Sequence, residues 1–336
     1  MTLKFLCVIN NKVYLLKEVV SMKKYLILLI LCVSVNLFSS SKSTMHGVYA
    51  LALSNKSQSF AVGFNSKVKI FNLRTNVILK IYNVGNFIRG LRFSKDDKYI
   101  AVWGFYGTLK LINTKTGKIK KLRLFTERII NLDFSPDNKL LAVINRIGKV
   151  KIIRLSDFKV IKNLRTNSYA STFVKFTHDN KYFVTTGRSK KVNVYRAGSY
   201  ILVKTFSTGH SFLNSITISR NNKYLLTTGY AKKVQLFNFK TGKLLKTINF
   251  RTRVWGAKFL PNRNNFVIIN GESGLLKLIN IHNSKTVINY KTGRHENYTL
   301  LSLSENGKYF ITKDNSYMVS LWNTFSLIRN KRFIQR

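Results

Sequence analysis

The sequence predicts an all-β fold, a seven-bladed β-propeller of four-stranded antiparallel blades. Three observations support it: a short phrase of apolar strand, turn and apolar strand recurs seven times, its copies are evenly spaced, and the segments between them alternate apolar and polar residues. Each copy has one anchor residue at the start of its turn: Ser54, Ser94, Ser135, Thr177, Ser219, Leu260 and Ser304. Successive anchors are 40, 41, 42, 42, 41 and 44 residues apart. A period of this length is typical of repeat architectures, in which each unit buries its apolar face against its neighbours.

Residues 87–126 show how one repeat is built. The turn segments read KDDK, FYG and TKTG, and such Asp, Gly and Thr residues favour turns by bonding their own backbone or by tolerating unusual backbone angles. The segments around them are predicted strands: FIRGLRFS at 87–94, KYIAVWG at 98–104, TLKLIN at 108–113 and KIKKLRLF at 118–125. Four short strands joined by tight turns make one antiparallel blade.

The predicted propeller covers residues 46–336. Its blades are expected at about 46–86, 87–127, 128–169, 170–211, 212–253, 254–297 and 298–336. Residues 327–333 are predicted to be the fourth strand of the last blade. On this interpretation no strand is borrowed from the N-terminus, and the ring closes by packing the last blade against the first.

The third strands resemble those of the WD-repeat family, in which an apolar pair is followed by Trp-Asp and a Thr-Gly turn. The matching segments are KIFNLRT at 69–75, KLINTKTG at 110–117, QLFNFKTG at 235–242, KLINIHN at 277–283 and SLWNTFS at 320–326. Trp322 alone keeps the Trp, and Asn stands at the Asp position. The Gly-His pair of the family occurs at Gly209-His210, but the Asp expected to bond this His is missing from GYAKK at 229–233. The resemblance implies a divergent WD-repeat-like propeller, and other seven-bladed families stay open.

Residues 1–43 are predicted to be a leader outside the propeller, with a signal peptide at 22–41. Met22 and two lysines precede an apolar run from Tyr25 to Val35, and small polar residues follow it. This run is too short to span a bilayer, which takes about 20 residues. Met22 is then a candidate start, and residues 1–21 are expected to belong to no folded unit. The alternative is an uncleaved apolar strand or a weak membrane anchor.

Both cysteines, Cys7 and Cys32, lie in this leader. The predicted propeller therefore has no disulfide and no Cys nucleophile or metal ligand. An exported chain of this kind is compatible with a bacterial periplasm or cell surface. The alternative localisation is cytoplasmic.

The chain is strongly basic, with 58 Lys and Arg against 12 Asp and Glu, a formal net charge of +46. Six lysines and one glutamate lie in residues 1–43, which leaves 52 against 11, or +41, for the rest. Such a field attracts polyanions, including nucleic acid, anionic headgroups and acidic polymers. The alternative is compositional, because Lys, Asn and Ile are all abundant, as AT-rich codons would make them.

The predicted topology separates these charges between two rims. First-to-second and third-to-fourth strand turns share what we call the anchor rim, and the remaining connections share what we call the basic rim. The acids Asp96, Asp97, Asp137, Asp179 and Glu305 lie in first-to-second strand turns of the anchor rim, among Lys98, Lys139, Lys181 and Lys308. The basic rim is expected to carry Arg128, Arg146, Lys149, Arg165, Arg188, Lys190, Lys191, Lys232, Lys233, Arg251, Arg253 and Arg294. Its acids are Glu127, Glu272, Glu296 and Asp314.

One position in each first strand is expected to surround the mouth of the central channel. These residues are Tyr49, Arg89, Ile130, Thr172, Asn214, Trp255 and Thr299. Exposed aromatic and Arg residues dominate binding hot spots, so Tyr49, Arg89 and Trp255 are candidate contacts. Alternatively, Trp255 plugs the channel and Arg89 is a solvated charge. The complete predicted partner-binding set is Tyr49, Arg89, Trp255, Arg188, Lys190, Lys191, Lys232, Lys233 and Arg253.

No catalytic, cofactor-binding or metal-binding residue is predicted. The five histidines show no ligand spacing, and His178 is expected to be solvated in a turn. Most carboxylates fall in rim turns, where two of them are not expected to be positioned for general acid–base catalysis. The leading hypothesis is a non-enzymatic, exported interaction module whose basic rim binds a protein or an anionic polymer. The alternatives are an intracellular scaffold or nucleic-acid-associated propeller, if the leader is not cleaved, and an enzyme acting at the channel mouth.

Overall fold

The computed structural model describes residues 5–9, 12–16, 48–85, 87–166, 173–187, 190–210, 212–290, 300–314, 319–324 and 329–333. The chain divides into two compact units. One comprises Met1–Met45 together with Arg336, and the other comprises His46–Gln335. Among the described residues, no helix has the length and apolar character needed to cross a membrane.

The first unit contains a hairpin in which β1 (Phe5–Ile9) pairs antiparallel with β2 (Lys12–Leu16). The expectation that residues 1–21 belong to no folded unit stays a prediction, because the structure describes only these two strands of that segment. A two-stranded hairpin by itself is only marginally stable in water. The predicted signal peptide at 22–41 lies outside the described residues.

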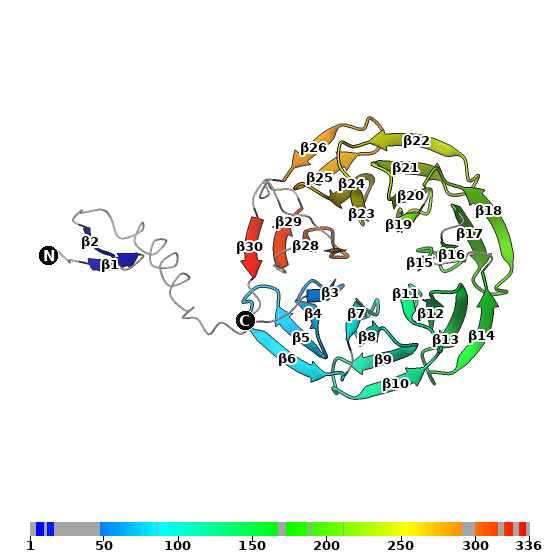
Figure 1. Ribbon diagram of the computed structural model, residues 1–336, viewed down its shortest axis with the longest axis horizontal. Helices are drawn as coiled ribbons and strands as arrows, with labels where there is room; N and C mark the ends of the chain where they lie inside the picture. The colour runs from blue at the N-terminus through cyan, green and yellow to red at the C-terminus, as the bar shows by residue number, and fades with distance from the viewer. Residues whose placement is uncertain are drawn as a thin grey trace. The chain divides into compact units, whose positions relative to one another are not determined.

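The second unit is a ring of seven four-stranded antiparallel sheets, which confirms the predicted fold (Figure 1). The first four blades contain β3 (Val48–Leu53), β4 (Ser59–Phe64), β5 (Lys67–Asn72), β6 (Ile78–Asn83), β7 (Ile88–Phe93), β8 (Tyr99–Gly104), β9 (Thr108–Asn113), β10 (Ile119–Arg123), β11 (Ile129–Phe134), β12 (Leu140–Asn145), β13 (Lys149–Arg154), β14 (Val160–Arg165), β15 (Phe173–Phe176), β16 (Tyr182–Thr186), β17 (Lys191–Arg196) and β18 (Leu202–Ser207). The last three contain β19 (Leu213–Ile218), β20 (Tyr224–Gly229), β21 (Lys233–Asn238), β22 (Leu244–Asn249), β23 (Val254–Leu260), β24 (Arg263–Gly271), β25 (Leu276–Asn280), β26 (Thr286–Asn289), β27 (Leu300–Leu303), β28 (Tyr309–Lys313), β29 (Val319–Asn323) and β30 (Arg329–Phe333).

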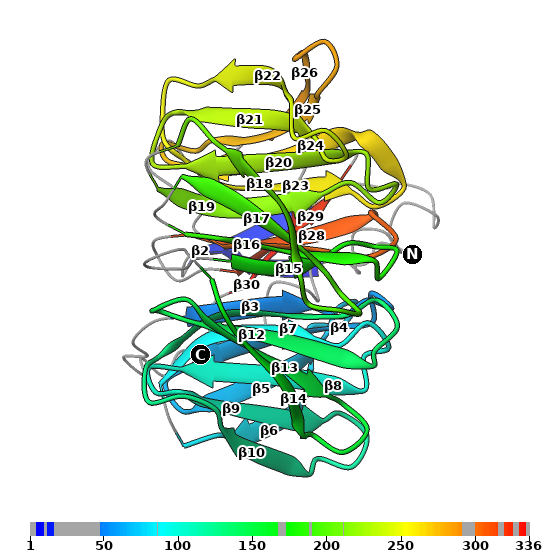
Figure 2. The ribbon, with the colours of Figure 1, turned by 90° about the vertical axis from the view of Figure 1, so that its right-hand side faces the viewer.

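Burial follows the position of a strand in its blade. The first strands, such as β7 and β11, lie nearest the ring axis, and the fourth strands, such as β10 and β14, form the circumference (Figure 1). Second strands are almost wholly buried, whereas β10 and β14 are exposed along most of their length. Seen from the side, the strands run between the two rims of the ring (Figure 2). Burial therefore falls from the inner strands of a blade to its fourth strand.

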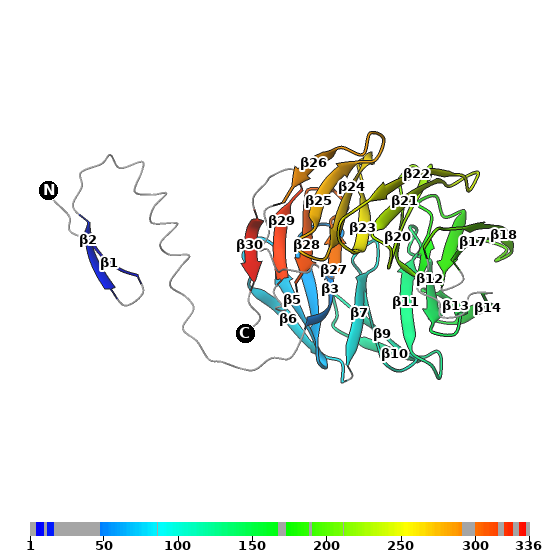
Figure 3. The ribbon, with the colours of Figure 1, turned by 45° about the horizontal axis from the view of Figure 1, so that its top comes forward.

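The blades are held together by apolar side chains that interdigitate between neighbours. Ile88 and Ile100 of the second blade pack in one cluster with Ala61 and Val68 of the first. The ring closes in the same way, because Val48 and its neighbours in the first blade share a cluster with apolar residues of the last. In that last blade β30 pairs with β29, which confirms the predicted fourth strand. A tilted view shows β30 as the outermost strand of the last blade (Figure 3).

The recurring anchor is explained by a buried hydrogen-bonded turn. Ser94 is fully buried, and its Oγ accepts the backbone N–H of Tyr99 at 2.9 Å and donates to Oδ1 of Asp96 at 2.6 Å. The same Oδ1 accepts the N–H of Lys98 at 3.0 Å. Equivalent side-chain pairs are Ser135–Asp137, Thr177–Asp179, Ser219–Asn221 and Ser304–Asn306. Asp96, Asp137 and Asp179 of the anchor rim therefore stabilise their turns by accepting a hydrogen bond from the buried anchor hydroxyl. A buried hydroxyl without such a partner would destabilise the fold.

Candidate functional site

The predicted channel-mouth residues share one backbone feature, a β-bulge at the basic rim. In the first blade, for example, Val48 and Ala50 pair with consecutive residues of β4, and Tyr49 is the extra residue between them. The corresponding extra residues in other blades are Arg89, Ile130, Asn214 and Trp255. A bulge redirects the side chain of its extra residue away from the regular pleat. Thr172 and Thr299 lie outside the described residues.

Arg89 lies against an exposed aromatic cluster. Its guanidinium carbon is 4.8 Å from the ring centroid of Phe105, a distance at which the ring attracts a cation. Phe105 meets Phe87 edge to face, with centroids 6.3 Å apart. These rings are 48% and 60% exposed, and the adjacent Tyr106 is 68% exposed. The second blade thus presents three aromatic side chains to solvent beside an arginine.

Two further arginines extend this cluster into the third blade. Burial lowers the pKa of Arg128, and the charges of Arg89 and Arg146 lower it further. The Nε of Arg128 is buried and has no hydrogen-bond partner among the described residues. No carboxylate in the described part of the chain forms an ion pair with any of the three. We call Arg89, Arg128 and Arg146 the arginine cluster.

Trp255 belongs to a second aromatic group, between the fifth and sixth blades. Its ring meets Tyr230 edge to face at 6.5 Å, and Tyr230 meets Phe212 at 5.2 Å. The guanidinium carbon of Arg253 is 5.8 Å from the ring centroid of Tyr230. Trp255 is half-buried against these neighbours and is not among the residues that line the central cavity. Its contacts therefore lie on the rim rather than across the channel.

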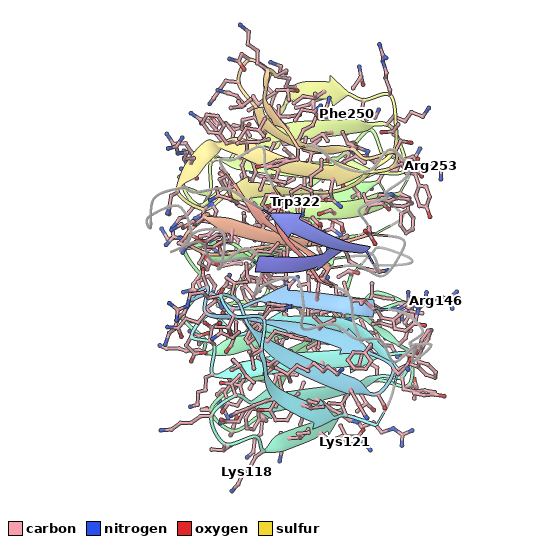
Figure 4. The ribbon with its side chains drawn as sticks, turned by 90° about the vertical axis from the view of Figure 1, so that its left-hand side faces the viewer. Lys118, Lys121, Arg146, Phe250, Arg253 and Trp322 are labelled. Carbon is pink, nitrogen blue, oxygen red and sulfur yellow. The ribbon has the colours of Figure 1, made fainter. Side chains whose placement is uncertain are left out.

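The remaining predicted residues occupy second-to-third strand turns of the fourth and fifth blades. Lys190, Lys191 and Lys232 are exposed, and Lys233 is half-buried. Arg188 lies outside the described residues. Arg146 and Arg253 project from the same side of the ring when it is seen edge on (Figure 4). The structure thus puts the described members of the predicted set on one rim, spread over several blades, and their role in binding stays a prediction.

Two carboxylates of the basic rim interact with neighbouring side chains. Glu127 accepts a hydrogen bond from Asn145 at 2.9 Å and lies 3.8 Å from Nζ of Lys149. Glu272 lies 3.7 Å from a terminal nitrogen of Arg253. Glu296 lies outside the described residues. These acids offset Lys149 and Arg253 but do not reach the arginine cluster.

A second candidate site lies on the ring axis, where a cavity of about 190 Å³ is lined by the first strands. One layer of its wall comes from the residue two positions before each anchor: Ala52, Arg92, Asp133, Lys175, Thr217, Lys258 and Ser302. A second layer comes from residues directly after the anchors: Asn55, Lys95, His178, Arg220, Pro261 and Glu305. Because this second layer belongs to the turns, the cavity reaches the anchor rim.

Ion pairs link the blades around this cavity. Asp133 accepts a hydrogen bond from Nη1 of Arg92 at 2.6 Å and lies 3.8 Å from Nζ of Lys175. Burial alone would raise the pKa of Asp133, but Lys175, Arg92 and Lys95 lower it to about 2. Nearer the anchor rim, Glu305 lies 2.9 Å from Lys95 and 3.4 Å from Arg220. Both carboxylates are therefore ionised at neutral pH.

Two basic groups of the cavity have unusual titration. Burial, followed by the charges of Lys175 and Arg92, lowers the pKa of Lys258 to about 7. Burial and Lys175 likewise lower the pKa of His178 to about 4, so the imidazole is neutral at pH 7. The expectation that His178 is solvated is wrong, since it is half-buried with Nε2 3.3 Å from the carbonyl oxygen of Ile218. The imidazole lies inward because the turn folds over the channel.

Sequence reasoning assigned no role to these channel charges. Arg92, Asp133, Lys175 and Lys258 lie in strands where they read as the polar half of an alternating pattern. Their positions could have predicted that they meet, because each of these residues stands two positions before the anchor of its blade. The sequence also did not single out Phe105, Tyr106 and Tyr230, which are exposed. The sequence of a turn does not indicate whether an aromatic side chain within it faces solvent or packs against the protein. Among the described residues, no group of three His, Cys, Asp or Glu side chains is arranged to hold a metal ion.

Comparison with known proteins supports the repeat assignment. The family model described as WD domain, G-beta repeat matches residues 201–238. This segment runs from the fourth strand of one blade through the third strand of the next, and it includes Gly209-His210. No curated protein matches the chain.

Proposed function

We propose that this chain, a divergent WD-repeat-like seven-bladed propeller, is a non-enzymatic exported interaction module that binds an acidic partner on its basic rim. Its fold is typical of protein-interaction scaffolds. The observation that carries the proposal is the arginine cluster, Arg89, Arg128 and Arg146, beside exposed Phe105 and Tyr106.

The chemistry of this cluster favours a carboxylate-bearing surface. Neighbouring guanidinium groups repel one another, so an anion placed among them interacts favourably with all three. Arginine also binds carboxylates through two parallel hydrogen bonds. The aromatic rings add apolar contact area, and their side chains lose little conformational entropy on binding because they have few rotatable bonds. An acidic protein surface that carries apolar side chains between its carboxylates fits both features.

An anionic polymer is the second candidate, favoured by the lysines of the fourth and fifth blades. Lys190, Lys191 and Lys232 are exposed on adjacent second-to-third strand turns. Lysine is a point charge that tolerates many geometries, as a flexible polyanion requires. The proposal of export rests on the sequence of residues 22–41 alone, and an exported module would meet either partner at the cell envelope.

Binding to poly-L-glutamate, followed by fluorescence anisotropy, tests the rim. Replacing Arg89 and Arg146 by Glu should weaken binding by at least about tenfold, since each reversal replaces attraction by repulsion. The matched control replaces Lys98 and Lys139 by Glu, which makes the same change in net charge on the anchor rim. Equal losses in both variants would show that overall charge, and not this rim, binds the polymer.

A further inference from the structure

The central cavity contains more positive than negative side chains. Five cations line it, Arg92, Lys95, Lys175, Arg220 and Lys258, and two carboxylates, Asp133 and Glu305. The formal excess is three positive charges when Lys258 is protonated, because the imidazole of His178 is neutral above its pKa of about 4. Like charges that share a partly desolvated space repel one another more strongly than in water. The cavity therefore favours an anion that carries more than one negative charge.

The ion pairs involve four of the five cations of the cavity, and Lys258 has no ion pair of its own, although the more distant Asp133 also acts on it. Asp133 is shared by Arg92 and Lys175, and Glu305 is shared by Lys95 and Arg220. Within the described part of the chain, no carboxylate lies at ion-pair distance from Nζ of Lys258. The lowered pKa of Lys258 has the charges of Lys175 and Arg92 among its causes, so the three groups lie close enough to interact.

We propose that the central cavity binds a phosphate group, held by Lys258 with Lys175 and Arg92. These side chains occupy the same strand position in the sixth, fourth and second blades, so they approach the ring axis from three sides. A phosphate group presents oxygens in several directions and carries more than one negative charge at neutral pH, whereas a carboxylate presents one edge and one charge. The arrangement therefore matches phosphate better than carboxylate.

The size and opening of the cavity agree with this ligand. A volume of about 190 Å³ is more than ten times the roughly 10–15 Å³ that a single water molecule needs. A phosphate group therefore fits in the cavity together with water. A phosphate ester would direct its organic substituent toward the anchor rim, where Asn55 and His178 line the opening. The site lies apart from the arginine cluster, so it stands or falls independently of the proposed rim function.

Isothermal titration of the full chain with inorganic phosphate tests the site, at about pH 6.5 where Lys258 is charged and at an ionic strength fixed with sodium chloride. The wild type should bind one phosphate per chain. Lys258→Met should weaken binding by at least about tenfold, as the loss of a partly buried charge-assisted contact implies. The control Lys139→Met removes one exposed cation of the anchor rim and should bind as the wild type does.

A second variant is expected to strengthen phosphate binding, which loss of folding could not explain. Glu305→Gln removes a carboxylate from the wall and should tighten phosphate binding several-fold. Thermal melting should show that Lys258→Met is at least as stable as the wild type, because it removes a buried charge that forms no ion pair. The proposal is overturned if phosphate shows no saturable binding, or if Lys258→Met and Lys139→Met weaken it equally.

Glycerol phosphate, titrated in parallel, distinguishes the two sources of the same group. Equal affinities would show that the site recognises the phosphate group alone. Tighter binding of the ester would identify a phosphate monoester whose organic part contacts the opening. Both results retain the site, and weaker binding of both ligands by Lys258→Met is required in either case.

Discussion

Arg92 donates a 2.6 Å hydrogen bond to Asp133 from the equivalent position of the neighbouring blade. The carboxylate also accepts the backbone N–H of Phe176, in the blade after its own, at 2.9 Å. One side chain thus links three consecutive blades at the ring axis. Together with the apolar packing between blades, this link helps to align the second, third and fourth blades along the axis.

Asp133→Asn should destabilise the propeller by about 3 kcal/mol, as expected when one partner of a buried ion pair is removed. The pKa of Asp133 is about 2 in the folded protein against the ordinary 3.8. The carboxylate therefore contributes its full stabilisation above about pH 4 and loses it as the pH falls through 2. Urea unfolding at pH 7 and pH 3 should show a smaller difference from the wild type at the lower pH. Asp157→Asn, at an exposed pair with Arg154, is the control and should change the free energy of unfolding little.

Lys258→Met should stabilise the propeller at pH 6 and have less effect at pH 10. The pKa of Lys258 is lowered to about 7, so between pH 7 and its ordinary 10.5 the unfolded chain binds a proton that the folded chain does not. Stability of the wild type therefore rises with pH across this window, as the cost of burying the charge disappears. Thermal melting at both pH values measures the difference. An advantage of the variant that is the same at pH 6 and pH 10 would contradict this assignment.

The anchor turns should differ in stability according to the residue two positions later. Ser94→Ala should cost about 2 kcal/mol, because it removes both the acceptor for the N–H of Tyr99 and the hydroxyl donor to Asp96. In the first blade the hydroxyl of Ser54 accepts backbone N–H groups, but the residue two positions later is Lys56. Ser54→Ala should therefore cost only about 1 kcal/mol. Chemical denaturation of the two variants compares them, and an equal cost would show that the carboxylate contributes nothing to the turn.

The lysines of the basic rim should produce a salt-dependent affinity for polyanions. If about six phosphate groups of a polyanion are contacted, the logarithm of affinity falls with the logarithm of salt concentration with a slope near −5. Reversing Arg188, Lys190, Lys191, Lys232 and Lys233 to Glu should abolish binding, whereas reversing Lys98, Lys139 and Lys181 should matter less. Anisotropy titrations over a series of salt concentrations measure both the slope and the difference between the variants.

Export predicts a mature protein that begins near Lys42. Cell fractionation followed by N-terminal sequencing of the native chain checks this. An N-terminus near Lys42 in an exported fraction would support envelope partners. An intact terminus at Met1 or Met22 in the cytosol would contradict export, and nucleic acid would then be the first polyanion to examine.

The predicted site was partly accessible from the sequence. The candidates Tyr49, Arg89 and Trp255 were selected by strand position, and the structure shows that this position is a bulge. Their neighbours were not predictable. Phe105 reaches Arg89 from the turn after the second strand, and Tyr230 reaches Trp255 from the preceding blade. Such contacts depend on how a turn folds over the rim, which no local pattern records.

The sequence by itself determined the number of blades, their strands and their turns, because those signals are local. Strand alternation and the bond from an anchor such as Ser94 to Asp96 involve residues only a few positions apart. The tertiary structure alone decided which charges meet. Arg92, Asp133 and Lys175 are about forty residues apart in sequence, and they converge because ring closure brings the same strand position of each blade to a common axis.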